Sequence, residues 1–225
     1  MPSVLVIGAS RGIGLEFARQ YAQDGWQVHA TYRTSGSALE SVAGVHCYPL
    51  EVTNDDELQQ LKQQLSDVTL DVLIINAGIY GQGDAFFGHT DKKLWLDAFQ
   101  VNTMAPLKIA EAFVENVARS EKKTITALSS KMGSMADNGS GGSYVYRSSK
   151  AALNAVMKSM SIDLADEFGI NVVTLHPGWV ITDMTGTNAL ITTEESVKGM
   201  RGVLDASSNA DRGKFLDYKG NEIPW

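Results

Sequence analysis

The sequence has little cysteine and no recurring pattern of metal ligands. Its single cysteine, Cys47, excludes an internal disulfide framework and a Cys-based zinc site, and it suits a reducing compartment. Cys47 lies in the apolar run Val45-His46-Cys47-Tyr48, which favours a buried structural thiol over a reactive one. The four histidines show no ligand spacing, so no metal site is predicted and His176 is interpreted as structural.

Long apolar runs and an excess of positive charge are missing as well. No segment approaches eighteen unbroken apolar residues, and the start lacks the basic region of a signal peptide. A cytoplasmic protein that does not contact membranes is therefore expected. The formal net charge of -7 disfavours a nucleic-acid binder and a polybasic membrane-surface protein. With 44% hydrophobic and 20% charged residues, the 225 residues fit one domain over 1–225.

Short apolar runs alternate with segments of helical periodicity along the chain. Strands are predicted at 4–7, 26–32, 45–52, 70–75, 124–128, 171–175 and 214–217. Helices are predicted after residue 14 and at 54–65, 92–119, 149–168 and 194–205, with loops at 79–90 and 132–143. This alternation specifies an α/β doubly wound parallel sheet of about seven strands in three layers, because right-handed crossovers place helices on both faces.

The first strand leads directly into a glycine-rich turn. The turn reads Gly8-Ala9-Ser10-Arg11-Gly12-Ile13-Gly14, and apolar residues then recur at helical spacing. Glycines at these three positions let the backbone turn tightly, approach a pyrophosphate and pack the helix against the strand. Strand, glycine turn and helix in one unit predict a dinucleotide site in a Rossmann fold, against the alternative of an ordinary βα turn.

The second strand indicates which dinucleotide is bound. An NAD site normally carries an acidic residue about 20 residues beyond the glycines, but Tyr32-Arg33-Thr34 stands there and no carboxylate follows until Glu40. Arg33, together with Arg11 in the glycine turn, favours a 2′-phosphate. NADP(H) is therefore preferred over NAD(H), against the alternative that both arginines are merely solvated.

A tyrosine and a lysine are spaced for acid/base chemistry. If the helix that includes 151–157 extends back over Tyr146 and Lys150, the two side chains stand one turn apart on one face. An ammonium so close to a phenol can tune its proton affinity. Tyr144 is the rival, but its six-residue spacing to Lys150 does not place both on one face, so it is expected to line the substrate pocket.

Six motifs in this order resemble the classical short-chain dehydrogenases/reductases, and the resemblance extends over nearly the whole chain. They are Gly8-x-x-x-Gly12-x-Gly14, Asn76-Ala77-Gly78, Asn102, Ser129-Ser130, Tyr146-x-x-x-Lys150 and Pro177-Gly178-x-x-x-Thr182. The stretches 141–154, 175–184 and 220–225 resemble more narrowly the C-factor/sniffer-like carbonyl reductases. Ile7, Ile75 and Glu51 depart from the usual Thr, Asn and Asp, which affects support of the cofactor loop and adenine contacts.

The resemblance implies roles for individual residues. The catalytic set is Asn102, Ser130, Tyr146 and Lys150. In it, Tyr146 protonates the alkoxide, Lys150 tunes Tyr146 and holds the nicotinamide ribose, Ser130 rather than Ser129 anchors the carbonyl, and Asn102 distorts its helix and holds a water. The expected cofactor-binding set is Gly8, Ser10, Arg11, Gly12, Ile13, Gly14, Arg33, Glu51, Val52, Asn76, Ala77, Gly78, Tyr146, Lys150, Pro177, Gly178, Val180 and Thr182.

Two functions follow as hypotheses. The first is an NADPH-dependent oxidoreductase that reduces a small apolar or aromatic aldehyde, ketone or quinone, and the second is an NAD(P)-binding signalling protein of C-factor type that acts through a partner. An apolar substrate pocket is expected from Trp179, Met184, Phe86, Phe87 and Met135, which fall on loops at the carboxyl edge of the sheet. The apolar stripe of the 149–168 helix suggests a homodimer or homotetramer.

Overall fold

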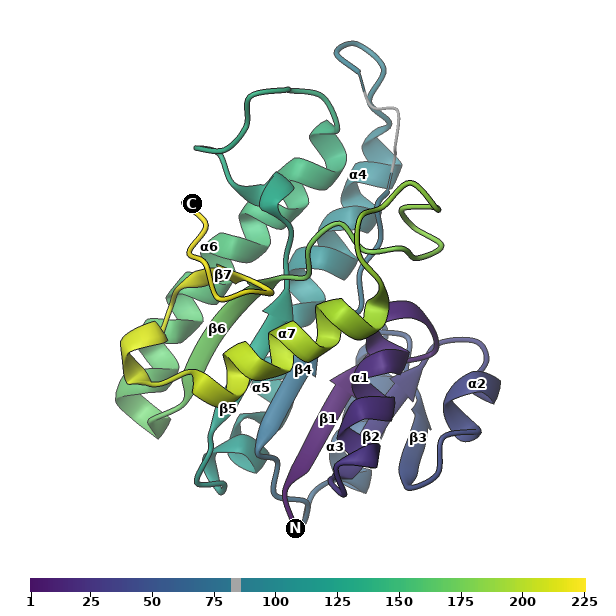
Figure 1. Ribbon diagram of the computed structural model, residues 1–225, viewed down its shortest axis with the longest axis vertical. Coiled ribbons are helices and arrows are strands. Elements are labelled where there is room, and N and C mark those ends of the chain that lie inside the picture. Colours follow the sequence, from purple (N-terminus) through teal and green to yellow (C-terminus); the bar gives the residue numbers. More distant parts are fainter. Residues whose placement is uncertain (82–85) are drawn as a thin grey trace.

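The computed structural model describes residues 1–81 and 86–225, and a sheet of seven parallel strands lies at its centre (Figure 1). The predicted 79–90 loop lies partly outside the described residues. The strands stand in the order β3-β2-β1-β4-β5-β6-β7, and each pairs in parallel with its neighbours. They are β1 (Ser3–Ile7), β2 (Gln27–Tyr32), β3 (Val45–Pro49), β4 (Val72–Ile75), β5 (Thr124–Leu128), β6 (Asn171–His176) and β7 (Phe215–Asp217).

The doubly wound sheet of seven strands is confirmed, with differences at element ends. β3 ends at Pro49 rather than at residue 52, because the chain turns at Glu51, where Asn54 N–H donates to Glu51 C=O at 2.8 Å. The helices are α1 (Gly12–Gln23), α2 (Ser37–Glu40), α3 (Asp55–Gln64), α4 (Lys92–Phe99), α5 (Ala105–Ala118), α6 (Tyr144–Phe168) and α7 (Thr193–Ala206). Short turns of other helix types are η1 (Gln100–Met104), η2 (Lys131–Gly133) and η3 (Asn209–Asp211). The one-turn helix α2 was not predicted, because four residues carry too little periodicity to be seen.

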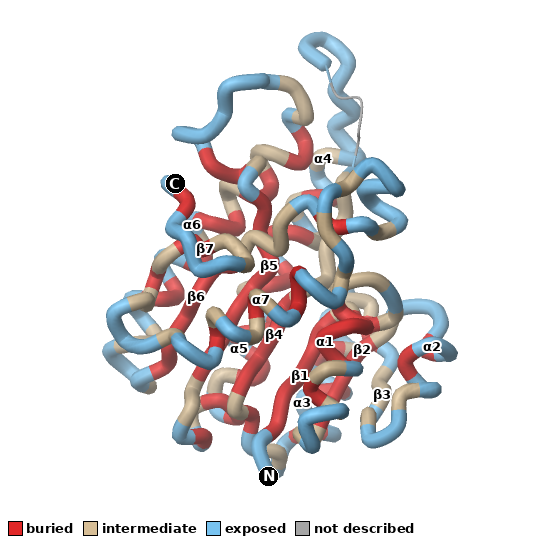
Figure 2. Tube along the Cα trace, in the orientation of Figure 1, coloured by how far each residue is buried: buried red, intermediate tan, exposed pale blue. Residues whose placement is uncertain are grey.

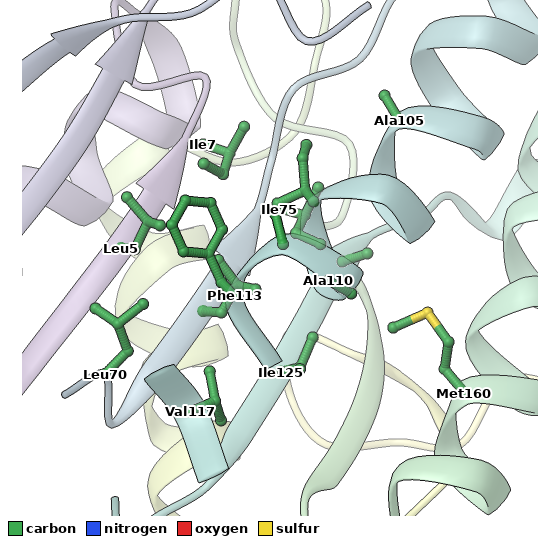
Figure 3. Close-up of a cluster of buried hydrophobic side chains, with 14 of the residues drawn as sticks. Leu5, Ile7, Leu70, Ile75, Ala105, Ala110, Phe113, Val117, Ile125 and Met160 are labelled. Carbon is green, nitrogen blue, oxygen red and sulfur yellow. The ribbon is translucent and has the colours of Figure 1, made fainter. Parts of the chain in front are cut away.

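Alternation along the strands divides the core into two layers. In β1, Leu5 and Ile7 face a cluster that includes side chains of α3, α5 and α6, whereas Val4 and Val6 face a cluster with α1 and α7. Both faces are buried, so the strand reads as an unbroken apolar run (Figure 2). Figure 3 shows Phe113 of α5 lying against Leu5 and Ile7.

The long helix predicted at 92–119 is interrupted. Asp91 caps α4 through hydrogen bonds from Lys93 N–H and Leu94 N–H, as the sequence indicated. Between α4 and α5 the chain makes the π-helical turn η1, which contains Asn102. The helical path is therefore distorted around Asn102, which is the distortion that the family resemblance implied.

The apolar stripe of α6 packs against the protein's own sheet. Three of its residues, Leu153, Met157 and Met160, are buried in the core cluster, and Val156, Leu164 and Phe168 pack against this cluster while partly exposed. The stripe therefore packs mainly against the sheet of its own chain and gives little support for a subunit interface. Among the described residues, no helix has the length and apolar character needed to cross a membrane.

Candidate active site

A cavity of about 920 Å³ opens at the carboxyl edge of the sheet. It lies where the chain order reverses, with β1 between β2 and β4, and ligands of such folds bind at that point. The longest loops rise from the same edge (Figure 1). The predicted residues that line it are Gly8, Ser10, Arg11, Gly12, Ile13, Arg33, Glu51, Val52, Asn76, Ala77, Gly78, Tyr146, Lys150, Pro177 and Thr182. A smaller hollow of about 660 Å³ over α7 and β7 contains none of them.

The glycine turn is held tightly between β2 and β4. Gly8 has φ of +82°, and a Cβ there would lie 2.8 Å from the Cα of Ala77. Gly8 N–H donates to the Thr31 hydroxyl at 2.9 Å, and the Asn76 amide donates to Gly8 C=O at 2.5 Å. A Cβ at Gly14 would lie 2.6 Å from Asn76 Nδ2. Only glycine fits at these two positions.

The first turn of α1 faces the cavity through Gly12 and Ile13. The N–H groups at a helix start lack partners within the helix and carry partial positive charge, so they suit a phosphate. The glycine backbone has no side chains that would keep a ligand away, and it lies beside a helix start and a large cavity. This arrangement fits the pyrophosphate of a dinucleotide. The residues present therefore fit the cofactor that the sequence predicted.

The departures from the family pattern receive a structural explanation. Ile7 and Ile75 are buried in the core and do not reach the cofactor turn. The hydroxyl that supports the turn comes instead from Thr31 at the end of β2. The sequence analysis missed Thr31, because a threonine inside a strand carries no motif.

Both arginines of the expected 2′-phosphate site line the cavity, and both face carboxylates. Arg11 forms an exposed ion pair with Asp183 at 2.7 Å, and Arg33 lies 3.9 Å from Glu51. Neither guanidinium is buried, so each remains able to turn toward an anion. These exposed ion pairs cost little to break.

Three predicted cofactor residues support the cavity without lining it. Gly14 is the last residue of the glycine turn and lies in the first turn of α1, packed against Gly8 and Asn76. Val180 is buried and bridges to Ile191 at the base of the 181–190 loop. Gly178 has φ of +87°, and a Cβ there would lie 2.7 Å from Ile191. Val180 and Gly178 shape the loop that follows β6, which brings Thr182 to the cavity wall.

Tyr146 and Lys150 lie one turn apart because α6 begins at Tyr144, five residues before the predicted start. Lys150 Nζ lies 5.9 Å from the centre of the Tyr146 ring and donates to Leu128 C=O at 2.8 Å. Burial lowers the pKa of Lys150 to about 8. Burial raises the pKa of Tyr146 to about 12, while a hydrogen bond with Ser130 acts in the opposite direction. Burial is the largest cause of this rise, so the phenol holds its proton, and the expected lowering of the Tyr146 pKa by Lys150 stays a prediction.

The two serines after β5 have different partners. Ser129 donates to Asn154 Oδ1 at 2.6 Å inside the protein. Ser130 caps η2 by accepting from Met132 N–H at 3.2 Å, and its side chain acts to lower the pKa of Tyr146. Ser129 lines the cavity and Ser130 does not, but the Ser129 hydroxyl is already bonded to Asn154. The Ser130 and Tyr146 hydroxyls therefore remain the pair that can converge on one substrate oxygen.

Asn102 is fully buried and clamps the chain that follows β4. Its Oδ1 accepts from Ile79 N–H at 2.8 Å, and its Nδ2 donates to Ile79 C=O at 2.8 Å and to Ser149 Oγ at 2.9 Å. A Cβ on Gly78 would lie 3.2 Å from Asn102 Oδ1 and 3.4 Å from Lys150 Nζ. Asn102 thus joins η1, α6 and the loop after β4 behind Lys150.

The expected apolar pocket is only partly found. Met184 lines the cavity, whereas Trp179, Phe86, Phe87 and Met135 do not, and at least half of each is exposed. Loop position in the sequence did not reveal side-chain direction.

Tyr144 is also absent from the cavity wall, so the structure does not support its expected place in the substrate pocket. His176 is packed beside the site, where its Nδ1 accepts from Lys131 N–H at 3.3 Å and burial lowers its pKa to about 4. A neutral acceptor that orders the turn after Ser130 agrees with the structural interpretation of His176. Cys47 is only partly buried, with its thiol pKa raised by burial.

The family model for short chain dehydrogenases matches residues 2–190. The protein named C-signal from Myxococcus xanthus is 42% identical over 156 residues, which cover 69% of this chain and 93% of that protein. The carbonyl reductase Sniffer of D. melanogaster superposes with a TM-score of 0.91 at 31% identity and covers 100% of both chains. The NADPH-bound carbonyl reductase from chicken fatty liver superposes with a TM-score of 0.90 at 34% identity, over 100% of this chain and 99% of that one.

Proposed function

The chain belongs to the short chain dehydrogenase family, and from this premise we propose that it is an NADPH-dependent reductase of a small apolar or aromatic aldehyde, ketone or quinone. The observation that carries the proposal is that Tyr146 and Lys150 stand one turn apart on α6 and both line the cavity. One domain, 1–225, would both bind the cofactor and hold the catalytic site.

The cofactor supplies a hydride when it is bound. The residues of the chain bind, orient and move one proton. The Ser130 hydroxyl donates a hydrogen bond to the substrate carbonyl oxygen, which stabilises the negative charge that develops there. Tyr146 gives its phenolic proton to that oxygen as the C–H bond forms, and a high phenol pKa suits a group that must arrive protonated.

Lys150 supports the phenolate that remains. Its ammonium lies one turn away, and it would also hold the nicotinamide ribose. The proton returns to Tyr146 along a path that we place through Lys150 and a water held near Asn102, which packs behind Lys150. Arg11 and Arg33 would leave Asp183 and Glu51 to bind the 2′-phosphate of NADPH.

A substrate screen tests the proposal most broadly. NADPH consumption is followed by its absorbance, with aliphatic aldehydes, aromatic aldehydes, cyclic ketones and quinones as substrates. Turnover of at least one class is expected, and NADPH should serve better than NADH. If no class is reduced although NADPH binds, the reductase assignment is wrong.

A second candidate function is supported by the 42% identity to C-signal. In this case the chain would bind NAD(P) and act through contacts with a partner. The two candidate functions can be distinguished by rescue of a strain that lacks this protein, provided that its loss causes a measurable phenotype. Rescue by a Tyr146→Phe variant that cannot reduce carbonyls would support the signalling function, and loss of rescue would support the enzyme.

A homodimer or homotetramer is also proposed. The apolar stripe of α6 does not support it, but Leu94, Leu96 and Met104 are exposed on α4 and η1 and could meet a second copy. Sedimentation of the protein at micromolar concentration decides the question. A Leu96→Lys variant should sediment as a smaller species if this surface is the interface.

A further inference from the structure

We propose that Tyr80 is a positioning residue for Tyr146, holding the catalytic ring in place and shielding one of its faces from water. This inference rests on the proposed function, in which Tyr146 is the proton donor. Tyr80 belongs to none of the motifs discussed above. It lies in the chain after β4, two residues beyond Asn76-Ala77-Gly78.

The rings of Tyr80 and Tyr146 are stacked. Their centres are 4.5 Å apart and their planes differ by 25°. Aromatic pairs at this separation contribute beyond their buried area and restrict rotation of both rings. Tyr146 has only two side-chain torsions, so a ring packed flat on one face fixes the direction of its hydroxyl. The hydroxyl direction matters, because it must reach both Ser130 and the substrate oxygen.

Tyr80 is itself held from two sides. Its hydroxyl is hydrogen-bonded to Ser143 Oγ at 3.2 Å. The residue before it, Ile79, has both its N–H and its C=O bound by the buried amide of Asn102. A side chain fixed at its tip and next to a clamped backbone is suited to hold another ring.

The partner segment is the start of α6. Ser143 has φ of +48°, a left-handed conformation that is uncommon for serine, and it directly precedes the helix. Gly81 follows Tyr80 with φ of +72°, and a Cβ there would lie 2.8 Å from Val145 Cγ1. The chain after β4 therefore runs directly against the first turn of α6, and the Tyr80–Ser143 bond joins them beside Tyr146.

The stack also influences proton affinity. The titratable groups that face Tyr146 are Lys150 on its own helix and Tyr80 after β4, while Ser130 after β5 is a neutral hydrogen-bond partner. Burial is the main reason that the Tyr146 pKa is raised, and Tyr80 acts in the same direction. Removal of the Tyr80 ring should admit water and let the Tyr146 pKa fall toward 10.

The test compares Tyr80→Leu, which removes the ring, with Tyr80→Phe, which keeps the ring and loses only the bond to Ser143. Tyr80→Met repeats the first change if the leucine variant does not fold. Tyr48→Leu is the control for general loss of a tyrosine, because Tyr48 lies on β3 and hydrogen-bonds His29. Each variant is assayed for kcat, for KM of NADPH and for titration of Tyr146. The titration is followed by NMR of ring-labelled tyrosine, with the Tyr146 signal assigned by its loss in Tyr146→Phe.

In Tyr80→Leu, kcat should fall roughly ten- to a hundredfold while KM for NADPH stays within about twofold, since a displaced proton donor slows chemistry and not cofactor binding. The Tyr146 titration should move to lower pH. Tyr80→Phe should recover most of kcat, and Tyr48→Leu should leave the Tyr146 titration unchanged.

Unchanged kcat and an unchanged Tyr146 titration in Tyr80→Leu would overturn the positioning role. A Tyr146→Phe variant that still reduces carbonyls would instead overturn the proposed function. In that event the NMR titration alone still decides whether Tyr80 holds and shields Tyr146.

Discussion

The Gly14→Ala substitution tests how closely the cofactor turn is packed, because the added Cβ would meet atoms of three residues. The new Cβ would lie 2.6 Å from Asn76 Nδ2 and 2.9 Å from Ala9 Cα, and closer still to Gly8 C=O. Two of the three atoms are backbone and cannot move aside cheaply. Overpacking of this kind costs about 1–3 kcal/mol. Loss of the Asn76–Gly8 hydrogen bond adds about 1 kcal/mol.

The combined cost of roughly 2–4 kcal/mol is divided between folding and cofactor binding. If the turn shifts and the fold is kept, the cost is seen as NADPH binding weakened roughly 30- to 1000-fold. The assay is fluorescence titration with NADPH, together with urea unfolding of the same samples.

Gly202→Ala is the matched control, because Gly202 lies within α7 and a Cβ there meets no atom within 4 Å. It should stabilise the protein by about 0.5–1 kcal/mol and leave NADPH binding unchanged. A Gly14→Ala protein that binds NADPH and unfolds like the wild type would refute the close approach of the turn.

Three further predictions concern other parts of the site. Between pH 8 and 10 the unfolded chain keeps the Lys150 proton that the folded chain releases, so stability should rise with pH. By urea unfolding, the wild type should gain about 2 kcal/mol relative to Lys150→Met over this range. Ser130→Ala should lower kcat about 10²-fold in steady-state kinetics. Ser129→Ala should mainly lower the free energy of unfolding, by about 1–3 kcal/mol in urea, because it leaves Asn154 Oδ1 buried without its donor. Arg33→Gln should raise KM for NADPH about tenfold and leave KM for NADH unchanged in steady-state assays.

The fold could be predicted because its signals are local. β1 and β4 are buried on both faces and are composed almost entirely of apolar residues, which few other structures produce. β5 and β6 are also mostly buried, and their apolar residues are interrupted only by threonines, one asparagine and one histidine. Helix caps such as Asp91 can be predicted from the sequence for the same reason, because the capping side chain bonds N–H groups only two and three residues further along the chain.

Residue roles that depend on a distant partner could not be predicted from the sequence. Thr31 supports the cofactor turn across 23 positions of sequence, and Tyr80 meets Tyr146 across 66. The start of α6 was expected too late for a local reason, because Gly141, Gly142 and the serines around them resemble loop. The direction of loop side chains such as Phe87 and Met135 depends on packing that no pattern in the sequence records.

The central claim is that Tyr146 donates the proton to the reduced carbonyl. Tyr146→Phe keeps the ring that stacks on Tyr80 and removes only the hydroxyl. With a carbonyl substrate found in the screen, the variant should bind NADPH like the wild type and lose at least about 10²-fold in kcat. Carbonyl reduction at the wild-type rate by the Tyr146→Phe protein would contradict the account.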